Sequence, residues 1–193
     1  MRSFTGFSRL LLAGIAAAAA ALSVTQAAQA APAARAGPPA PAVPGEIQVP
    51  AGNKVFLVGH AVGVQIYSCN ASAGGFAWGF VAPRANLYND HGKLIITHFA
   101  GPTWQAKDGS TVVGRAEASV TVDATAIPWV RLAAASTAAG PDGDRLVHTT
   151  YIQRIATTGG LAPPAAECTA ATAGTVAEVP YTADYYFWKH TGA

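Results

Sequence analysis

The residues from Thr97 to Gly114 include the side-chain types that catalysis and binding most often use. His98, Asp108 and Ser110 are the residue types of an acid–base–nucleophile triad, and Trp104 could stack on a flat ligand. A triad, however, is a spatial arrangement, and the chain has no G-x-S-x-G sequence of the kind that exposes a nucleophilic serine on a sharp turn. Asp108 precedes a glycine, a pair typical of β-turns. The stretch therefore favours a hairpin with a binding role over an active site, with His98 as a structural histidine or a rim contact.

The register of this hairpin decides where its tryptophan points. If Asp108-Gly109 is a two-residue turn, Trp104 faces Val113 and lies on the polar side of the strand. If Lys107–Gly109 is a three-residue loop with the glycine left-handed, Trp104 faces Val112 and joins the apolar side. Because tryptophan is usually largely buried, we expect the inward position.

A second aromatic stretch, Val179–Trp188, reads VPYTADYYFW. In a strand, Tyr181, Tyr185 and Phe187 share one face, and Asp184, Tyr186 and Trp188 share the other. One row can fill a core, while the second could stack on sugar rings or another flat ligand, unless the strand is buried on both faces. The candidate ligand-binding residues of the chain are thus His98, Trp104, Gln105, Asp108, Asp184, Tyr186 and Trp188.

Metal and cofactor chemistry have little support in the sequence. The five histidines form no H-x-H or H-E-x-x-H pattern, and no calcium-loop pattern is present. We therefore expect no metal site and no cofactor.

The elements that must position these residues are strands. Helical periodicity is almost absent after residue 30, whereas Val112–Val122 alternates small or apolar residues with polar ones. In Val55–Tyr67 the larger apolar residues share one parity, and a loop is expected at Ala133–Ala139. Further strands are expected at Phe76–Pro83, Leu94–Phe99, Ile127–Ala133, Val147–Ile155 and Val176–Trp188, with glycine-rich turns between them. The pattern predicts an all-β fold, an antiparallel β-sandwich or barrel, and leaves the choice between them open.

The N-terminal region predicts export. Arg2 and Arg9, the apolar run Leu10–Leu22 and the sequence Ala28-Gln29-Ala30 are typical of a signal peptide cleaved after Ala30. We expect residues 1–30 to be this signal, residues 31–50 to be a Pro/Ala-rich linker, and residues 51–193 to form a single all-β domain. The mature protein is then secreted (extracellular or periplasmic) without membrane insertion.

The charge of the mature chain argues against nucleic acid partners, and its cysteine content is typical of an exported protein. The chain has 12 Lys+Arg and 10 Asp+Glu, and loss of Arg2 and Arg9 with the signal leaves equal numbers. A neutral domain lacks the basic surface that nucleic acid binding requires. The two cysteines, Cys69 and Cys168, are far apart in the sequence, which in an exported chain predicts a disulfide bond.

Five segments of the chain, in order, resemble a family of secreted bacterial and fungal proteins classified only as a domain of unknown function, DUF3455. These segments are VGVQIYSC (Val62–Cys69), HFAGPTWQAKDGSTVVG (His98–Gly114), AIPWVRLAA (Ala126–Ala134), YIQRIATTGGLAPPAAEC (Tyr151–Cys168) and VPYTADYYFW (Val179–Trp188). The resemblance implies export and one compact domain, but no activity and no catalytic residues. Some members are labelled malate dehydrogenase. This chain lacks the G-x-G-x-x-G and βαβ pattern that such an enzyme would need.

Two classes of function are consistent with the sequence, besides a structural envelope protein with no small ligand. The first is a non-catalytic binding module for an unknown small molecule or a glycan, such as a cell-wall ligand. The alternative is a small secreted hydrolase that uses His98 and a carboxylate such as Asp108 or Asp184. We favour the binding module because no acid–base signature is assembled in the sequence.

Overall fold

The structure is a computed structural model that describes residues 37–192 of the 193-residue chain. The predicted signal peptide and the first part of the predicted linker lie outside these residues. The described part is all-β, as predicted, with three short 3-10 helices. Its elements are η1 (Gly45–Ile47), β1 (Asn53–Ser72), β2 (Gly75–Tyr88), β3 (Leu94–Phe99), β4 (Thr103–Ala106), β5 (Thr111–Val120), β6 (Trp129–Ala138), β7 (Tyr151–Gly159), η2 (Ala165–Glu167), η3 (Ala170–Thr172) and β8 (Val176–His190).

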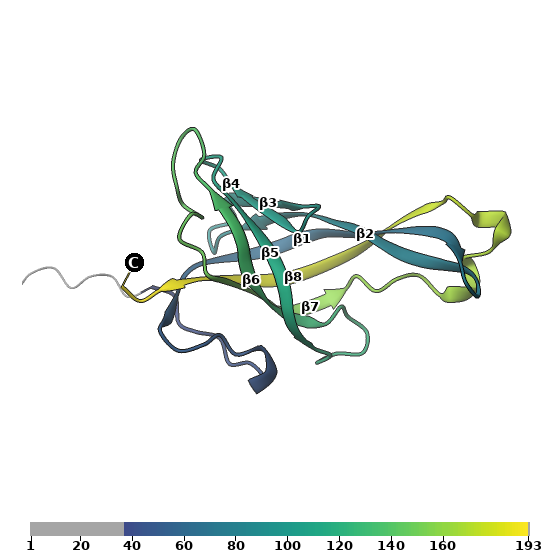
Figure 1. Ribbon diagram of the computed structural model, residues 1–193, viewed down its shortest axis with the longest axis horizontal. Helices are drawn as coiled ribbons and strands as arrows, with labels where there is room; N and C mark the ends of the chain where they lie inside the picture. The colour runs from purple at the N-terminus through teal and green to yellow at the C-terminus, as the bar shows by residue number, and fades with distance from the viewer. Residues whose placement is uncertain (1–36, 193) are drawn as a thin grey trace, which may run out of the picture. The chain divides into compact units, whose positions relative to one another are not determined.

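The eight strands form one closed antiparallel barrel, so the barrel is the correct member of the predicted pair of folds. Each strand pairs with its neighbour in the sequence (Figure 1). The barrel closes where β1 pairs with β8, in a register that runs from Asn53 opposite His190 to Ser68 opposite Val176. Closure leaves no unpaired sheet edge in the ring.

The interior holds side chains from alternate positions of every strand. Its core includes Leu57, Leu87, Ile96, Trp104, Val112, Leu132, Ile152, Tyr185 and Phe187. On β1 the inward positions are the odd-numbered ones, whereas the larger apolar residues that share the even parity face outward; Val62 is 60% exposed. The inward positions of β1 include the small residues Gly59 and Ala61. A Cβ atom at Gly59 would come within 3.0 Å of Leu87, so glycine leaves room for that side chain.

The segment Ala133–Ala139 was expected to be a loop, and this expectation is wrong. Residues 133–138 continue β6, where Ala138 pairs with Thr111 of β5. Alanine has a low intrinsic preference for strands, but pairing with a neighbouring strand overrides it. The following loop places Leu146, which is fully buried, into the core at this end of the barrel.

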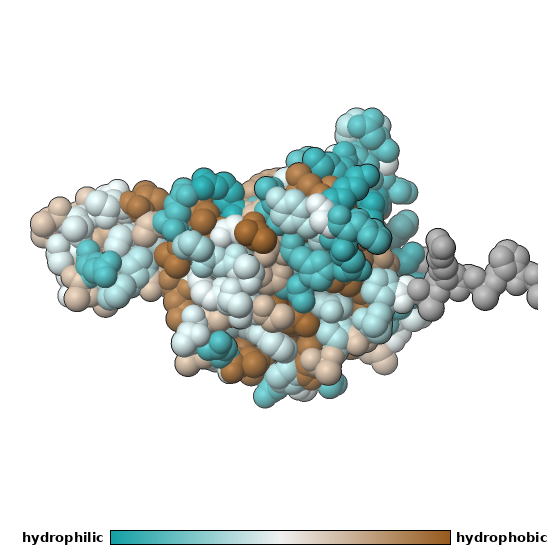
Figure 2. Space-filling model, turned by 180° about the vertical axis from the view of Figure 1, so that it is seen from behind, coloured by the Kyte–Doolittle hydropathy of each residue, from teal (hydrophilic) through white to brown (hydrophobic). Residues whose placement is uncertain are grey.

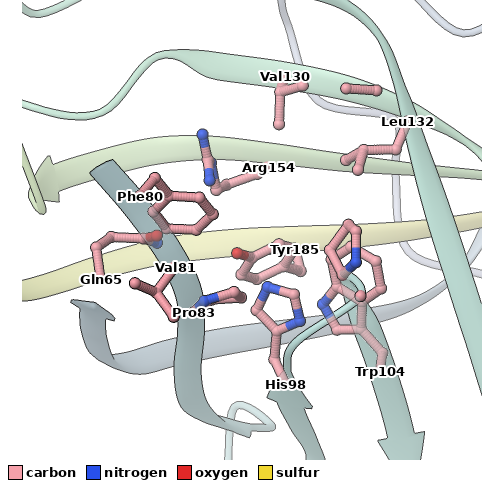
Figure 3. Close-up of a pocket in the computed structure, with 13 residues that line it drawn as sticks. Gln65, Phe80, Val81, Pro83, His98, Trp104, Val130, Leu132, Arg154 and Tyr185 are labelled. Carbon is pink, nitrogen blue, oxygen red and sulfur yellow. The ribbon is translucent and has the colours of Figure 1, made fainter. Parts of the chain in front are cut away.

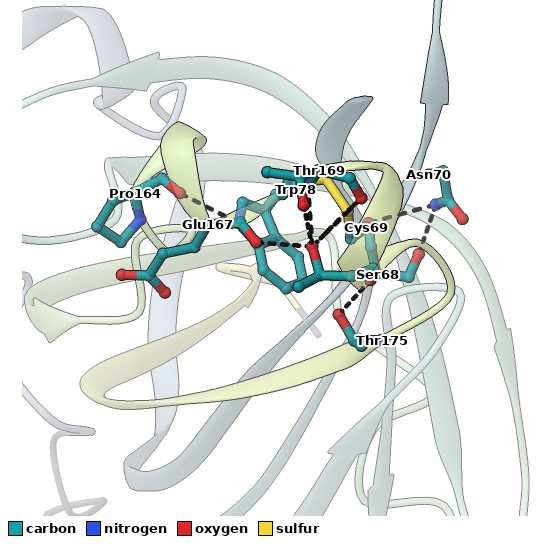
Figure 4. Close-up of a disulfide and its surroundings, with 10 residues drawn as sticks. Ser68, Cys69, Asn70, Trp78, Pro164, Glu167, Thr169 and Thr175 are labelled. Atoms are coloured by element: carbon teal, nitrogen blue, oxygen red, sulfur yellow. Dashed lines mark hydrogen bonds between the residues drawn. A yellow bond between two sulfur atoms is a disulfide. The ribbon is translucent and has the colours of Figure 1, made fainter. Parts of the chain in front are cut away.

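Beyond the barrel, the end of β1, the start of β2, the chain before β8 and the first residues of β8 extend together, and we call this part the disulfide arm (residues 67–82 and 161–180; Figure 1). Cys69 and Cys168 are bonded, as predicted, with an S–S distance of 2.01 Å. The indole Nε1–H of Trp78 donates to the Pro164 carbonyl at 3.3 Å, which adds a second link (Figure 4). In the chain-entropy model a disulfide closing a loop of this length stabilises the fold by about 4–5 kcal/mol.

The described part of the Pro-rich N-terminal segment, residues 37–50, packs against the outside of the barrel. Ile47 in η1 is fully buried, and its carbonyl accepts a hydrogen bond of 2.7 Å from the Gln153 side chain on β7. The guanidinium of Arg131 donates to the carbonyl of Gln48. This part of the segment therefore covers an outer face of β6–β8, while the boundaries of the signal and the linker remain predictions.

The surface of the barrel is mixed in character. Figure 2 shows hydrophobic patches among hydrophilic ones on the face in view. None of the helices in residues 37–192 is long and apolar enough to cross a membrane.

Candidate functional site

The interior of the barrel contains a cavity of about 330 Å³ at the end from which the disulfide arm extends. All eight strands contribute to its wall, together with the turn between β3 and β4. Its lining residues are Gln65, Phe80, Val81, Pro83, His98, Gly101, Pro102, Trp104, Ala116, Val130, Leu132, Arg154 and Tyr185. Figure 3 shows Gln65, Phe80 and Val81 on one side of this space and His98 and Trp104 on the other, with Tyr185 between them.

Trp104 points into the barrel, as expected from the three-residue loop. It pairs with Val112, and Gly109 has a left-handed φ of 81°. The indole is 1% exposed. Its ring lies over Gly114, where a Cβ atom would come within 2.9 Å of the indole. Glycine at this position of β5 thus provides the space that the tryptophan occupies.

His98 is stacked on Trp104. The ring centroids are 4.2 Å apart and the planes differ by 7°. The Nδ1–H donates to the Thr103 carbonyl at 2.9 Å, which makes Nε2 the unprotonated nitrogen of the neutral ring. Burial lowers the pKa of His98 to about 3, with a smaller contribution from the positive charge of Arg154. His98 is therefore a neutral, fixed part of the cavity wall at physiological pH.

Tyr185 and Arg154 complete the polar part of the cavity wall, and Tyr181 lies behind Tyr185 in the core. The hydroxyls of Tyr181 and Tyr185 are 3.3 Å apart, and burial raises the pKa of both side chains. The nearby Arg154 guanidinium opposes this rise at Tyr185. Arg154 comes from β7 and donates to the Pro128 carbonyl at 2.8 Å. Among residues 37–192, none of the ion pairs includes Arg154.

Gln105 and Asp108 lie away from this cavity. Gln105 is exposed on the outer side of β4. Asp108 holds the hairpin loop: its Oδ1 accepts hydrogen bonds from the backbone N–H and the hydroxyl of Ser110, at 3.0 and 2.6 Å. Its Oδ2 accepts from the backbone N–H of Arg145 at 2.9 Å. The hydroxyl of Ser110 makes the largest contribution to lowering the pKa of Asp108. The aspartate thereby ties the β4–β5 loop to the β6–β7 loop.

The remaining candidates lie on the outer face of β8. Trp188 is 8% exposed, and its indole N–H donates to the Gln153 side chain at 2.9 Å. Residues 40–43 and 48–49 lie beside it. Tyr186 and Asp184 are partly exposed, so the outward row does not form one continuous open platform. The inward row, Tyr181, Tyr185 and Phe187, is buried in the core, as the alternation along the strand suggested.

Asp184 belongs to a cluster that the sequence did not reveal, which we call the His60 cluster (His60, Asp90 and Asp184). His60 on β1 contacts Asp184 through Nδ1 at 2.7 Å and Asp90, in the β2–β3 turn, through Nε2 at 2.8 Å. The hydrogen bonds to Asp90 and to Asp184 raise the pKa of His60 above its ordinary value. Both ring nitrogens are occupied, so His60 does not offer a free base.

The sequence therefore predicted two residues of the cavity wall, His98 and Trp104. It did not identify Gln65, Arg154 and Tyr185 as candidate site residues. The spacing of residues along β7 and β1 could have identified the two polar residues, Arg154 and Gln65. Arg154 lies two residues from the buried Ile152, and Gln65 follows Gly63 and Ala61 at the inward spacing of a strand. A charged or amide side chain on an inward parity indicates a polar group in the interior.

Within the described residues, no group of three or more His, Cys, Asp or Glu side chains is placed to hold a metal ion. Fold and site together define a closed eight-stranded antiparallel barrel with an interior cavity of mixed aromatic and polar lining. The chain belongs to the family described as "Protein of unknown function (DUF3455)", which its residues 50–189 match. Neither a curated protein nor a solved structure matches the chain.

Proposed function

We propose that this is an exported, non-catalytic binding protein that holds one small, mainly apolar molecule inside its barrel. The observation that carries the proposal is the interior cavity of about 330 Å³, to which every strand contributes. The interior of an eight-stranded barrel is either filled by its own side chains or holds a single small ligand. The volume lies at the lower end of the range of ligand pockets, roughly 300–1,000 Å³.

Exposed apolar side chains lie at the rim of the cavity. Phe80 and Val81 line the cavity at the base of the disulfide arm and are 57% and 55% exposed. Large apolar side chains that stay in contact with water beside a pocket are typical of binding sites. An interior cavity with this rim favours a small molecule over a polymeric glycan.

A hydrolase at His98 has less support. A histidine base works best with a pKa near the working pH and is commonly oriented by a carboxylate, whereas burial lowers the pKa of His98 to about 3. The hydrogen bond of His98 goes to a backbone carbonyl, and the two carboxylates considered for it are engaged elsewhere, Asp108 with Ser110 and Asp184 with His60.

Export is part of the proposal. The disulfide bond supports it, because such bonds persist in oxidising compartments outside the cytoplasm. Protein recovered from the medium of the native host should begin at Ala31, or at Ala28, on N-terminal sequencing. Recovery only of cell-associated protein that begins at Met1 would contradict export and leave the cavity proposal untouched.

Binding in the cavity can be tested with a neutral, apolar fluorescent probe, N-phenyl-1-naphthylamine, whose emission rises in an apolar site. Ala116 lines the cavity, whereas Ala118 on the same strand does not. We expect the wild type and Ala118→Phe to bind the probe and Ala116→Phe to lose binding while remaining folded by circular dichroism. Equal binding by all three proteins, or by none, would refute the proposal.

A further inference from the structure

The cavity contains a positive charge with no negative partner. Arg154 is partly buried. Its Nε atom is shielded from solvent and makes no hydrogen bond within residues 37–192, and one of its two terminal NH₂ groups donates to the Pro128 carbonyl. Burying a guanidinium without a carboxylate is costly unless something else pairs with it. Since His98 is neutral, Arg154 is the charged side chain of the cavity wall.

Two further unpaired groups in the same wall are also hydrogen-bond donors. Gln65 is 2% exposed, and its amide nitrogen has no partner among the described residues; the same holds for the indole N–H of Trp104. Buried polar groups are nearly always hydrogen-bonded, and those that are not require an explanation. Arg154 Nε, Gln65 Nε2 and Trp104 Nε1 each lack an acceptor among the described residues, so the missing partner is a group rich in acceptor oxygens.

Most of the remaining wall is apolar. Phe80, Pro83, Val130 and Leu132 line the cavity together with the faces of the aromatic residues. Figure 3 shows the Arg154 guanidinium beside Phe80 and above Tyr185, with Val130 and Leu132 on the same side of the space. An apolar body could pack against these side chains while its polar end reaches the guanidinium.

We propose that the ligand is a small organic acid, a carboxylate with a one- or two-ring or similarly sized apolar body, and that Arg154 binds its carboxylate. Arginine suits this role because its planar guanidinium matches the geometry of a carboxylate. Gln65 and Trp104 supply further donors at the wall, and the apolar side chains contact the body. This inference rests on the proposed function and names the class of ligand for the same cavity.

The test compares two probes of the same shape, 2-naphthoate and its neutral amide, 2-naphthamide, by isothermal titration calorimetry on the mature protein. We expect 2-naphthoate to bind at least about tenfold more tightly, the ratio that an additional hydrogen bond to a charged group provides. In Arg154→Met the preference should disappear, with the amide affinity unchanged. Arg131→Met, which removes an arginine from the outer side of the neighbouring strand, should keep it.

The outcomes separate the two proposals. If the amide binds as tightly as the acid, or if only N-phenyl-1-naphthylamine binds, the organic-acid inference is wrong and the cavity-binding proposal stands. If none of the three probes binds, both are wrong. The comparison of acid and amide on the wild type does not depend on whether an Arg154 variant folds, and preference for the acid in a folded Arg154→Met would also overturn the role of Arg154.

Discussion

Two histidines of this protein occupy opposite environments. His98 faces the inside of the barrel, stacked on an indole and hydrogen-bonded to a backbone carbonyl, and burial lowers its pKa to about 3. His60 lies on the outer side of β1, between Asp90 and Asp184, whose hydrogen bonds raise its pKa. The same side chain is held neutral in one place and favoured as a cation in the other.

The difference shows how charge is distributed between the two regions. Outside, the cationic form of His60 meets carboxylates of the protein itself, so the cluster is complete. Inside, the described residues offer Arg154 no carboxylate, and the donors of Gln65 and Trp104 are unpaired. An internally paired cluster serves structure, whereas an unbalanced one is a better candidate for a ligand.

The largest effect should come from removing the ring that supports the interior histidine. Trp104 contacts His98, Tyr185 and Phe187, so Trp104→Ala should lower the free energy of unfolding by about 3–5 kcal/mol. Gln105→Ala, on the exposed side of the same strand, should change it by less than about 0.5 kcal/mol. Chemical denaturation measures both. A tolerated Trp104→Ala would show that the cavity wall is not well packed.

A smaller loss should follow from adding one methyl group inside the barrel. At Gly114 a Cβ atom would lie 2.9 Å from the indole of Trp104 and 3.0 Å from Leu132, so Gly114→Ala should cost about 1–3 kcal/mol. The matched control is Gly79→Ala in the disulfide arm, where the nearest atom would be 3.6 Å away. Thermal unfolding of the two variants should separate them clearly, and equal melting temperatures would contradict the packing described here.

The interior histidine should make the protein sensitive to acid. Its pKa is about 3 in the folded state and 6.5 ordinarily, so between these values the unfolded chain binds a proton that the folded protein does not. Stability should fall as the pH drops from 6.5 towards 3, by up to about 1.4 kcal/mol per pH unit from this group. Unfolding of His98→Gln across this range should show a shallower slope than that of the wild type; parallel slopes would refute the assignment.

The outer histidine should give the smallest effect, with the opposite sign. Because its folded pKa is raised, the stabilisation from His60 is present below pH 6.5 and is lost as the pH rises through the raised value. The side chains of the cluster are substantially exposed, which limits this contribution to less than about 1 kcal/mol and makes it weaker in high salt. His60→Gln should therefore differ from the wild type below this window and match it above. A difference that grows with pH would be inconsistent with the cluster.

Local sequence patterns were sufficient to predict most of the strands and part of the candidate site. Alternation predicted the strands, the two cysteines predicted the disulfide, and the preference of tryptophan for the interior predicted the hairpin register at Trp104. The interior position of Arg154 was not predicted, because a charged residue in a strand is normally assigned to the outer face. His60 and Asp184 are 124 positions apart, and only the pairing of β1 with β8 brings them together.

That same pairing sets the order in which the molecule can be completed. β1 is the first strand of the ring and β8 the last, so their long antiparallel register cannot form until the chain has been made as far as His190. The seven earlier strands can associate by local hairpins, but closing the ring is a contact of high sequence separation, the kind that slows folding. Tyr185 reaches the cavity from this final strand. We therefore expect the cavity to be completed late in folding, and a partly folded form that lacks β8 would lack this part of the cavity wall.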